Sequence, residues 1–272
     1  MQHTVESVSR TVERLWPLSG AENWDAPGLL SGDPASTVER IVLAVDAVAA
    51  TVDEAVAVDA DLLLVHHPLL LRGVTSVAED RYKGALLARL IRADCALIAA
   101  HTNADVVADG TSSVLATRLG LGDTRPIEAA PDGVTGIGRV GTLSEPTTLG
   151  ALARRLAEIL PATAGGILAS GDYGQQVSRV ALCGGAGDAY LSADAVRGAD
   201  VYITADLRHH PASEAREQAM HAGGPALLDV SHWASEWLWL DTAAEQLRAA
   251  LPGVSVEVSE LRTDPWDFAI LQ

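Results

Sequence analysis

The stretch that decides the fold is Asp59–Leu71, which reads DADLLLVHHPLLL. Its apolar run LLLV is too short for the core of a helix and has the length of a strand buried on both faces. The run ends in two adjacent histidines, His66 and His67, and is closed by Pro68. In an open α/β sheet, ligands bind at the carboxyl ends of the strands. The two imidazoles are therefore candidate metal ligands; the alternative is that they cap the strand by bonding nearby carbonyl groups.

Composition restricts the class of protein. A chain of 272 residues fits about two domains. Acidic residues outnumber basic ones by 36 to 19, giving a formal net charge of −17, so a nucleic-acid partner is not expected. The sequence shows no signal peptide and no apolar stretch that could span a bilayer, and we expect a cytoplasmic protein without a membrane partner. Cys95 and Cys183 lie in apolar runs and are expected to be inert core residues.

Apolar runs alternate with amphipathic helical patterns along the whole chain. Besides the opening stretch, strands are predicted at Arg40–Asp46, Cys95–Ala100, Val177–Cys183, Asp200–Thr204 and Ala226–Val230. Alternation of this kind predicts parallel strands joined by helical crossovers, and therefore an α/β fold. A Pro- and Gly-rich loop from Pro126 to Gly136 is the best boundary candidate. We predict domains at 1–128 and 129–272, and the C-terminal tail is free to pack back on the first half.

The two halves repeat one pattern. ADLLLVHHP (60–68) is followed by ALIAAHTNAD (96–105), and ADVYITADLRHHP (199–211) by ALLDVSHWASE (226–236). Each copy has Ala-Asp before a strand, then His-His-Pro, then a second strand that ends in His-x-x-x-carboxylate. This pattern predicts an internal duplication: two similar α/β domains with mixed or parallel sheets flanked by helices, and a metal site between them. We expect His66–His67 to overlay His209–His210, and His101 to overlay His232.

The repeated residues suit metal binding. His232 and Glu236 are four apart and share one face of a helix, so both can reach one ion. Imidazole and carboxylate together favour Zn, Fe, Mn or Ni. His66 and His67 diverge if extended and could hold one ion each, which indicates two metals. The glycines after the Val177–Cys183 strand are better explained as a tight turn than as a phosphate loop, because Asp188 directly behind them would repel a phosphate.

Several motifs resemble one family. HHPLLL, HTNADVVADG, RVALCGGAG, TADLRHH and SHWASE resemble the Nif-three-like family, and ENWDAPGL resembles its Trp-Asp-x-x-Gly-Leu opening. Its members are dinuclear metal-centre hexameric proteins, often called GTP cyclohydrolase I type 2 homologues. The resemblance spans nearly the whole chain and implies two α/β halves around a two-metal site, assembled into a toroidal homohexamer. We expect this chain to lack the middle domain that longer members insert.

The resemblance also implies roles for individual residues. The implied metal ligands are His66, His67, Asp105, His232 and Glu236, with Glu236 bridging two divalent ions, most simply Zn, Fe or Mn. His101 and His210 are the implied catalytic proton carriers, and Asp206 and His209 lie near the site. The chain departs from the family pattern at Ala205, His209 and Ser231, where the family usually has Gly, Tyr and Gly. These departures affect the expected pocket more than the expected ligands.

The function implied by the resemblance is metal-dependent hydrolysis. In this reading the protein opens the imidazole ring of GTP and releases formate. Two alternatives stay open: a non-enzymatic hexameric ring that binds metal or a partner, and a hydrolase of another small molecule, such as a phosphoester. The implied partners are further copies of the chain and a small-molecule substrate. Nothing in the sequence itself specifies guanine or a triphosphate.

We predict that Glu236→Gln releases more metal than Asp105→Asn does. A bridging carboxylate offsets the repulsion between two dications, which amounts to several kcal/mol even at an effective dielectric of about 20. Bound metal would be counted in both variants after dialysis at fixed free metal. Equal loss from both variants, or a greater loss from Asp105→Asn, would assign the bridge to a different residue.

Overall fold

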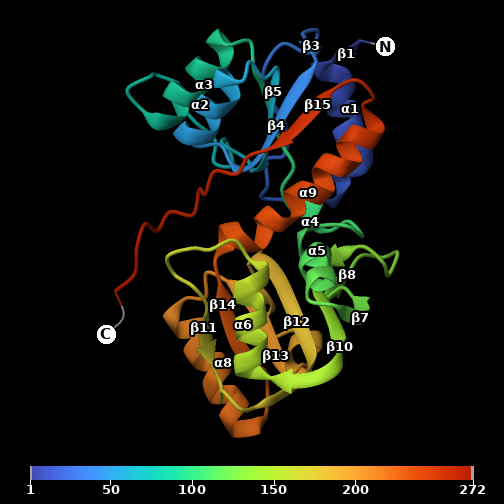
Figure 1. Ribbon diagram of the computed structural model, residues 1–272, viewed down its shortest axis with the longest axis vertical. Coiled ribbons are helices and arrows are strands. Elements are labelled where there is room, and N and C mark those ends of the chain that lie inside the picture. Colours follow the sequence, from blue (N-terminus) through green and yellow to red (C-terminus); the bar gives the residue numbers. More distant parts are fainter. Residues whose placement is uncertain (1, 271–272) are drawn as a thin grey trace. The chain divides into compact units, whose positions relative to one another are not determined.

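The computed structural model describes residues 2–270, and these form two compact units of mixed α/β structure (Figure 1). The first unit contains the chain up to Val107 together with Leu240–Thr263. The second contains Ala108–Trp239 and the segment from Asp264 onward. No helix within 2–270 combines the length and the apolar character needed to cross a bilayer.

The first unit is built around a five-stranded sheet in the order β15-β4-β5-β6-β2. Strands β15, β4, β5 and β6 are parallel, and β2 is antiparallel to β6. The elements of this unit are β1 (His3–Thr4), α1 (Val5–Leu15), η1 (Leu18–Gly20), β2 (Gly28–Ser31), β3 (Thr37–Val38), β4 (Arg40–Asp46), α2 (Ala49–Ala57), β5 (Leu62–His67), α3 (Tyr82–Arg92), β6 (Ala96–Ala99), α4 (Thr102–Asp105) and β15 (Ser255–Val258).

Strand β5 is the centre of this sheet. Its residues Leu62 to Val65 have no exposed surface, as expected for a strand covered on both faces. Leu63 and Val65 point to one face and pack in a core with Val52 of α2 and Leu90 of α3. Burial of this strand is therefore what places the two histidines at its carboxyl end.

The second unit has a six-stranded sheet in the order β11-β14-β13-β12-β10-β7. Strands β12, β13 and β14 are parallel, whereas β11, β10 and β7 are each antiparallel to their neighbour. Its elements are α5 (Thr111–Arg118), β7 (Leu121–Arg125), β8 (Glu128–Ala129), β9 (Gly136–Ile137), β10 (Arg139–Thr148), α6 (Leu149–Ile159), β11 (Leu168–Ser170), β12 (Gln176–Ala186), η2 (Asp188–Tyr190), α7 (Asp194–Arg197), β13 (Val201–Ala205), α8 (His209–Ala222) and β14 (Ala226–Val230). Helix α9 (His232–Ala250) begins in this unit and ends in the first.

Four strands have the same order and direction in both units. The first unit has β4-β5-β6-β2 and the second has β12-β13-β14-β11. In each case three parallel strands are followed by an antiparallel edge strand that precedes them in the sequence. The next strand differs, because β15 is parallel to β4 whereas β10 is antiparallel to β12. The shared order is what an internal duplication predicts.

In each copy an aspartate links the starts of two neighbouring strands. Asp61 accepts hydrogen bonds from the backbone amides of Glu39 and Arg40 at 2.7 and 2.8 Å. In the second unit Asp200 accepts from the amides of Ser178 and Arg179 at 2.8 and 2.7 Å. The backbone bonds match as well: Asp61 lies between Arg40 and Ala96, and Asp200 between Arg179 and Ala226. The Ala-Asp of the sequence repeat is therefore a structural clasp at the start of the sheet.

This match also corrects the expected alignment of the histidines. Counting from Asp61 and Asp200, His67 corresponds to Asp206 and not to His210. Counting from Ala96 and Ala226, His101 corresponds to Ser231, one residue before His232. The His-His-Pro of the second copy lies four residues later, in the first turn of α8. The expected overlays were wrong because the His-His-Pro motif belongs to the end of β5 in the first copy but begins α8, after the end of β13, in the second.

The units also divide at a different point from the predicted boundary at residue 128. Helix α5 belongs to the second unit, where the hydroxyl of Ser112 accepts from the Gly184 amide of β12 at 3.1 Å. The end of α9 and β15 belong to the first unit, where Val256 pairs with Ile41 of β4. Side-chain packing of α5 on β12, rather than the Pro- and Gly-rich loop, sets the division.

We predict that Asp61→Ala and Asp200→Ala each lower the free energy of unfolding by about 1–3 kcal/mol, because two backbone amides lose their acceptor. Urea unfolding followed by circular dichroism would measure the change. Asp53→Ala is the matched control: its carboxylate is 63% exposed and pairs with Arg89 on the surface, so the loss should be about 0–1 kcal/mol. An unchanged free energy of unfolding in either variant would show that the strand starts do not need the aspartate there.

Candidate metal centre

The end of β5 positions two imidazoles, each fixed through Nδ1. His66 is fully buried, and its Nδ1 donates to the carbonyl oxygen of Ala100 at 2.8 Å. His67 is partly exposed, and its Nδ1 donates to the carboxylate of Asp46 at 2.7 Å. Asp46 is the direct neighbour of His67 across the parallel pair β4 and β5. A neutral imidazole whose Nδ1 carries the proton presents its Nε2 lone pair to a ligand.

A third imidazole follows strand β6. His101 Nδ1 donates to Asp25 Oδ1 at 2.8 Å, and the Asp25 side chain has no exposed surface. The other oxygen of Asp25 accepts from the amide and hydroxyl of Thr102. Burial raises the pKa of Asp25, but the hydrogen bonds from His101 and Thr102 outweigh it and hold the pKa well below its usual range. Asp25 is therefore a permanent carboxylate behind His101.

These three imidazoles converge. One nitrogen each of His66, His67 and His101 lie within 4.8 Å of one another, and the ring centres are 5.1–5.4 Å apart. Asp105, at the end of α4, brings its Oδ1 to 3.7 Å from His66 Nε2. Two ligands of one tetrahedral zinc ion would be roughly 3.4 Å apart. The donor set and its spacing fit a divalent metal ion.

The first turn of α9 holds a second group. His232 Nε2 lies 3.0 Å from Glu236 Oε1, one helical turn later, and His232 Nδ1 donates to Asp206 Oδ2 at 2.7 Å. Burial lowers the pKa of His232, but the charges and hydrogen bonds of Glu236 and Asp206 outweigh it and raise this pKa to about 11. Two carboxylates around one imidazole make this turn a strong site for positive charge.

Gly185 makes room for this group. It has φ +68°, and a Cβ built on it would lie 2.3 Å from Glu236 Oε1 and 3.1 Å from His232 Nε2. Its amide donates to Ser235 Oγ at 2.9 Å. The glycines of β12 therefore permit close approach of the Glu236 carboxylate. The sequence pattern predicted a tight turn here, and the part of Gly185 in the site was not predicted.

All four imidazoles share one arrangement: Nδ1 of His66, His67, His101 and His232 is bonded to an oxygen acceptor. Histidines that bind metals in proteins show this arrangement, because the acceptor fixes the tautomer and the ring orientation. Three of the four acceptors are carboxylates, which also favour a cation nearby. The Ala100 carbonyl bonded to His66 can only accept a hydrogen bond, so the Nδ1 of His66 must carry the proton.

The structure groups most of the predicted site residues within each unit. His66, His67, His101 and Asp105 come together in the first unit, and Asp206, His232 and Glu236 in the second. His209 and His210 are exposed on the first turn of α8, with their rings 5.2 Å apart. Their predicted roles, and the bridging role of Glu236, stay predictions.

Sequence reasoning missed the carboxylates behind the imidazoles. Asp25 belongs to the ENWDAPGL motif and Asp46 ends the predicted strand Arg40–Asp46, but neither was assigned a role in the site from the sequence. The parallel pairing of β4 and β5 was the available signal for Asp46, because it places the two strand ends side by side. Asp25 lies 76 residues from His101 in the sequence, and no local pattern connects them.

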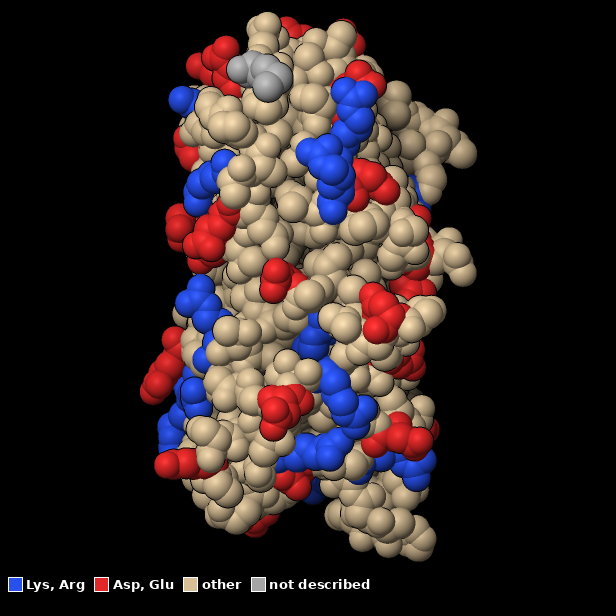
Figure 2. All heavy atoms as spheres, turned by 90° about the vertical axis from the view of Figure 1, so that its right-hand side faces the viewer, with Lys and Arg blue, Asp and Glu red and all other residues tan. Residues whose placement is uncertain are grey.

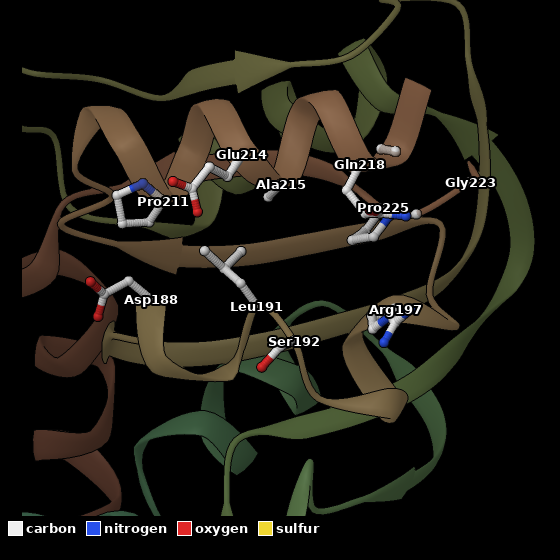
Figure 3. Close-up of a pocket in the computed structure, with 12 residues that line it drawn as sticks. Asp188, Leu191, Ser192, Arg197, Pro211, Glu214, Ala215, Gln218, Gly223 and Pro225 are labelled. Atoms are coloured by element: carbon white, nitrogen blue, oxygen red, sulfur yellow. The ribbon is translucent and has the colours of Figure 1, made fainter. Parts of the chain in front are cut away.

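A cavity lies elsewhere in the second unit (Figure 3). It has a volume of about 470 Å³ and lies between α8 and the segment of η2 and α7. Asp188 and Glu214 line one end, and Arg197 the other. Its described lining includes none of the predicted metal ligands.

The fold and the imidazole cluster define a class of α/β protein with a candidate metal centre, and comparison with known proteins gives the family. The model of the family described as Duf34/NIF3 (NGG1p interacting factor 3) matches residues 3–265. The chain belongs to this family. A Streptomyces coelicolor protein named GTP cyclohydrolase 1 type 2 homolog is 46% identical over 270 residues, covering 96% of this chain and 93% of that protein.

Other relatives agree with this assignment. A Mycobacterium leprae protein of the same name is 34% identical over 376 aligned positions, covering 98% of this chain and 96% of that protein. Because this chain has 272 residues, that relative carries additional ones. A hypothetical protein of Staphylococcus aureus has a crystal structure with a TM-score of 0.86 and 26% identity, covering 98% of this chain and 99% of that one. A Bacillus cereus protein related to NIF3 shares the fold at a TM-score of 0.89 and 22% identity, with the same coverage of both chains.

We predict that Asp46→Ala weakens zinc binding about 10–100-fold, because His67 loses the acceptor that fixes its Nδ1 proton and ring orientation. Titration with a competing chromophoric chelator would measure the affinity. Asp53→Ala, which removes a surface carboxylate of the same unit, should leave it unchanged. Equal affinities for the wild type and the Asp46 variant would exclude a supporting role for this residue.

Proposed function

We propose that the protein binds two divalent metal ions per chain, with His66, His67, Asp105, His232 and Glu236 as ligands and His101 beside them. The observation that carries this proposal is that every one of the four histidines is held through Nδ1, which leaves Nε2 as the coordinating nitrogen. The nitrogen and oxygen donors suit Zn, Fe or Mn. The two cysteines, Cys95 before β6 and Cys183 in β12, are buried and are not part of the donor set.

The chemistry we propose is metal-dependent hydrolysis. A bound divalent ion would supply Lewis acidity to a polar group of the substrate. The residues of the chain hold and orient the imidazoles: Asp46 fixes His67, and Asp25 fixes His101 through Nδ1. An imidazole fixed in this way by a buried carboxylate is suited to hold or pass a proton. We assign that role to His101, with His210 as the second candidate.

The substrate we propose first is GTP, with opening of the guanine imidazole ring and release of formate. The names of the relatives support this choice. The charge of the chain does not: the formal net charge is −17, and basic and acidic side chains are interspersed on the face shown in Figure 2. A polyanionic substrate would then depend on metal and local cations for its binding. A less charged small molecule is the second candidate for this reason.

We further propose that the chain assembles with copies of itself into a homohexamer in the cytoplasm. Family membership supports the assembly. Within this proposal the imidazole clusters face the interior of the ring. A hexamer that binds metal without turnover would be the non-enzymatic alternative.

The test is a metal count followed by a turnover assay. After reconstitution with Zn or Mn and dialysis at fixed free metal, elemental analysis should find close to two ions per chain. His66→Ala should lose at least one of them, since a buried ligand is removed. His221→Ala, which removes an exposed histidine of α8, is the matched control and should keep both.

Turnover would be measured as formate release from GTP, alongside a panel of phosphoesters. Formate that depends on added metal and disappears in His66→Ala would support the first substrate. Metal binding without formate would leave the phosphoester panel to decide between another hydrolase and a ring that only binds. A chain that stays free of metal after reconstitution would overturn the proposal as a whole.

A further inference from the structure

The segment after Asp264 exposes three large apolar side chains. Trp266, Phe268 and Ile270 are 68%, 76% and 79% exposed, and Phe268 is the single phenylalanine of the chain. They alternate with Asp267 and Ala269. Apolar residues at every second position share one face of an extended strand. Scattered exposed apolar residues are ordinary, but a contiguous row of this kind marks an interaction surface.

Beyond Trp266, whose amide is bonded to Asp264, the backbone of this segment up to residue 270 is available for pairing. The segment is anchored at its start, where Asp264 Oδ2 accepts from Ser231 Oγ at 2.6 Å and Asp264 Oδ1 accepts from the Trp266 amide at 3.1 Å. From residue 265 to 270 the chain forms neither helix nor strand (Figure 1). An extended peptide with one apolar face and open amide and carbonyl groups can add to the edge of a sheet.

The same unit carries a complementary edge. Strand β11 pairs only with β14 among the described strands, so its outer side is open. Leu168 on this strand is 63% exposed, and Tyr173 shortly after it is 61% exposed. The guanidinium of Arg154 lies over the Tyr173 ring, 5.3 Å from its centre. Within residues 2–270, the edge and the tail thus both offer unpaired backbone and apolar side chains. They carry opposite charges, since the edge has Arg154 and the tail has Asp267.

We propose that the segment 265–270 of one copy adds as a strand to β11 of a second copy of this chain. The tail and the edge are different surfaces, so each copy can donate its tail to one neighbour and receive the tail of another. Contacts of this head-to-tail type form a ring where the rotation between neighbouring copies closes, and an open filament where it does not. The inference rests on the proposed self-assembly and specifies the contact that holds it.

The test compares two variants by light scattering after gel filtration. Trp266→Ser, Phe268→Ser and Ile270→Ser combined remove the apolar face of the tail, and Leu168→Lys blocks the edge. Both variants should form smaller particles than the wild type. Val134→Ser, which removes an apolar side chain that is 64% exposed outside both surfaces, is the control and should keep the wild-type mass. Circular dichroism would check that each variant is folded.

Mixing the two variants gives the decisive readout. One supplies an intact edge and the other an intact tail, so the equal mixture should form larger particles than either variant alone. No increase, or a Leu168→Lys variant of wild-type mass, would show that the tail docks elsewhere and overturn the inference. A tail variant of wild-type mass would overturn it while leaving self-assembly intact. A monomeric wild type would overturn both, and none of these results alters the metal count.

Discussion

The hydrogen bond between His67 Nδ1 and Asp46 Oδ1 depends on the register of two buried parallel strands. Strands β4 and β5 pair from Ile41 and Leu62 onward, so their last residues face each other. If β5 slipped by one residue, His66 and His67 would exchange faces and the carboxylate would lose its imidazole. The fully buried run before the histidines makes such a slip costly, because every apolar side chain would leave its packing site. The position of His66 and His67 therefore depends on the packing of the core before them.

The same dependence explains how much of the fold the sequence could predict. The predicted strands Arg40–Asp46 and Ala226–Val230 coincide with β4 and β14, because continuous apolar runs in buried parallel strands give a strong local pattern. Strand β10 was not predicted. It reads RVGTLSEPTT, and its partly exposed antiparallel position permits polar residues. Pro146 lies where its pairing with β12 shifts register, a place that tolerates a missing amide.

For the candidate site, the sequence predicted the candidate metal ligands better than the carboxylates that orient them. His66 and His67 follow an apolar run, and His232 and Glu236 follow a helical spacing, so local patterns reveal both pairs. Asp25 is connected to His101 only through the folded chain. The predicted alignment of the two copies was wrong for a related reason. Similar residue motifs recur in both copies, but the hydrogen bonds of Asp61 and Asp200, which only the folded chain shows, define which positions correspond.

That correspondence has a consequence for how the protein evolved. Counted from the two clasps, Asp46 of the first copy corresponds to Gly185 of the second, and His67 corresponds to Asp206. At these positions the first copy has a carboxylate that supports an imidazole on the neighbouring strand. The second copy has a glycine that makes room for the Glu236 carboxylate and an aspartate that supports an imidazole of helix α9, and the pairing of β12 with β13 shifts register between Leu182 and Ala186. A duplicated fold does not need identical halves, and here the two halves differ both in how a carboxylate supports an imidazole and in the direction of the strand next to β4 and β12.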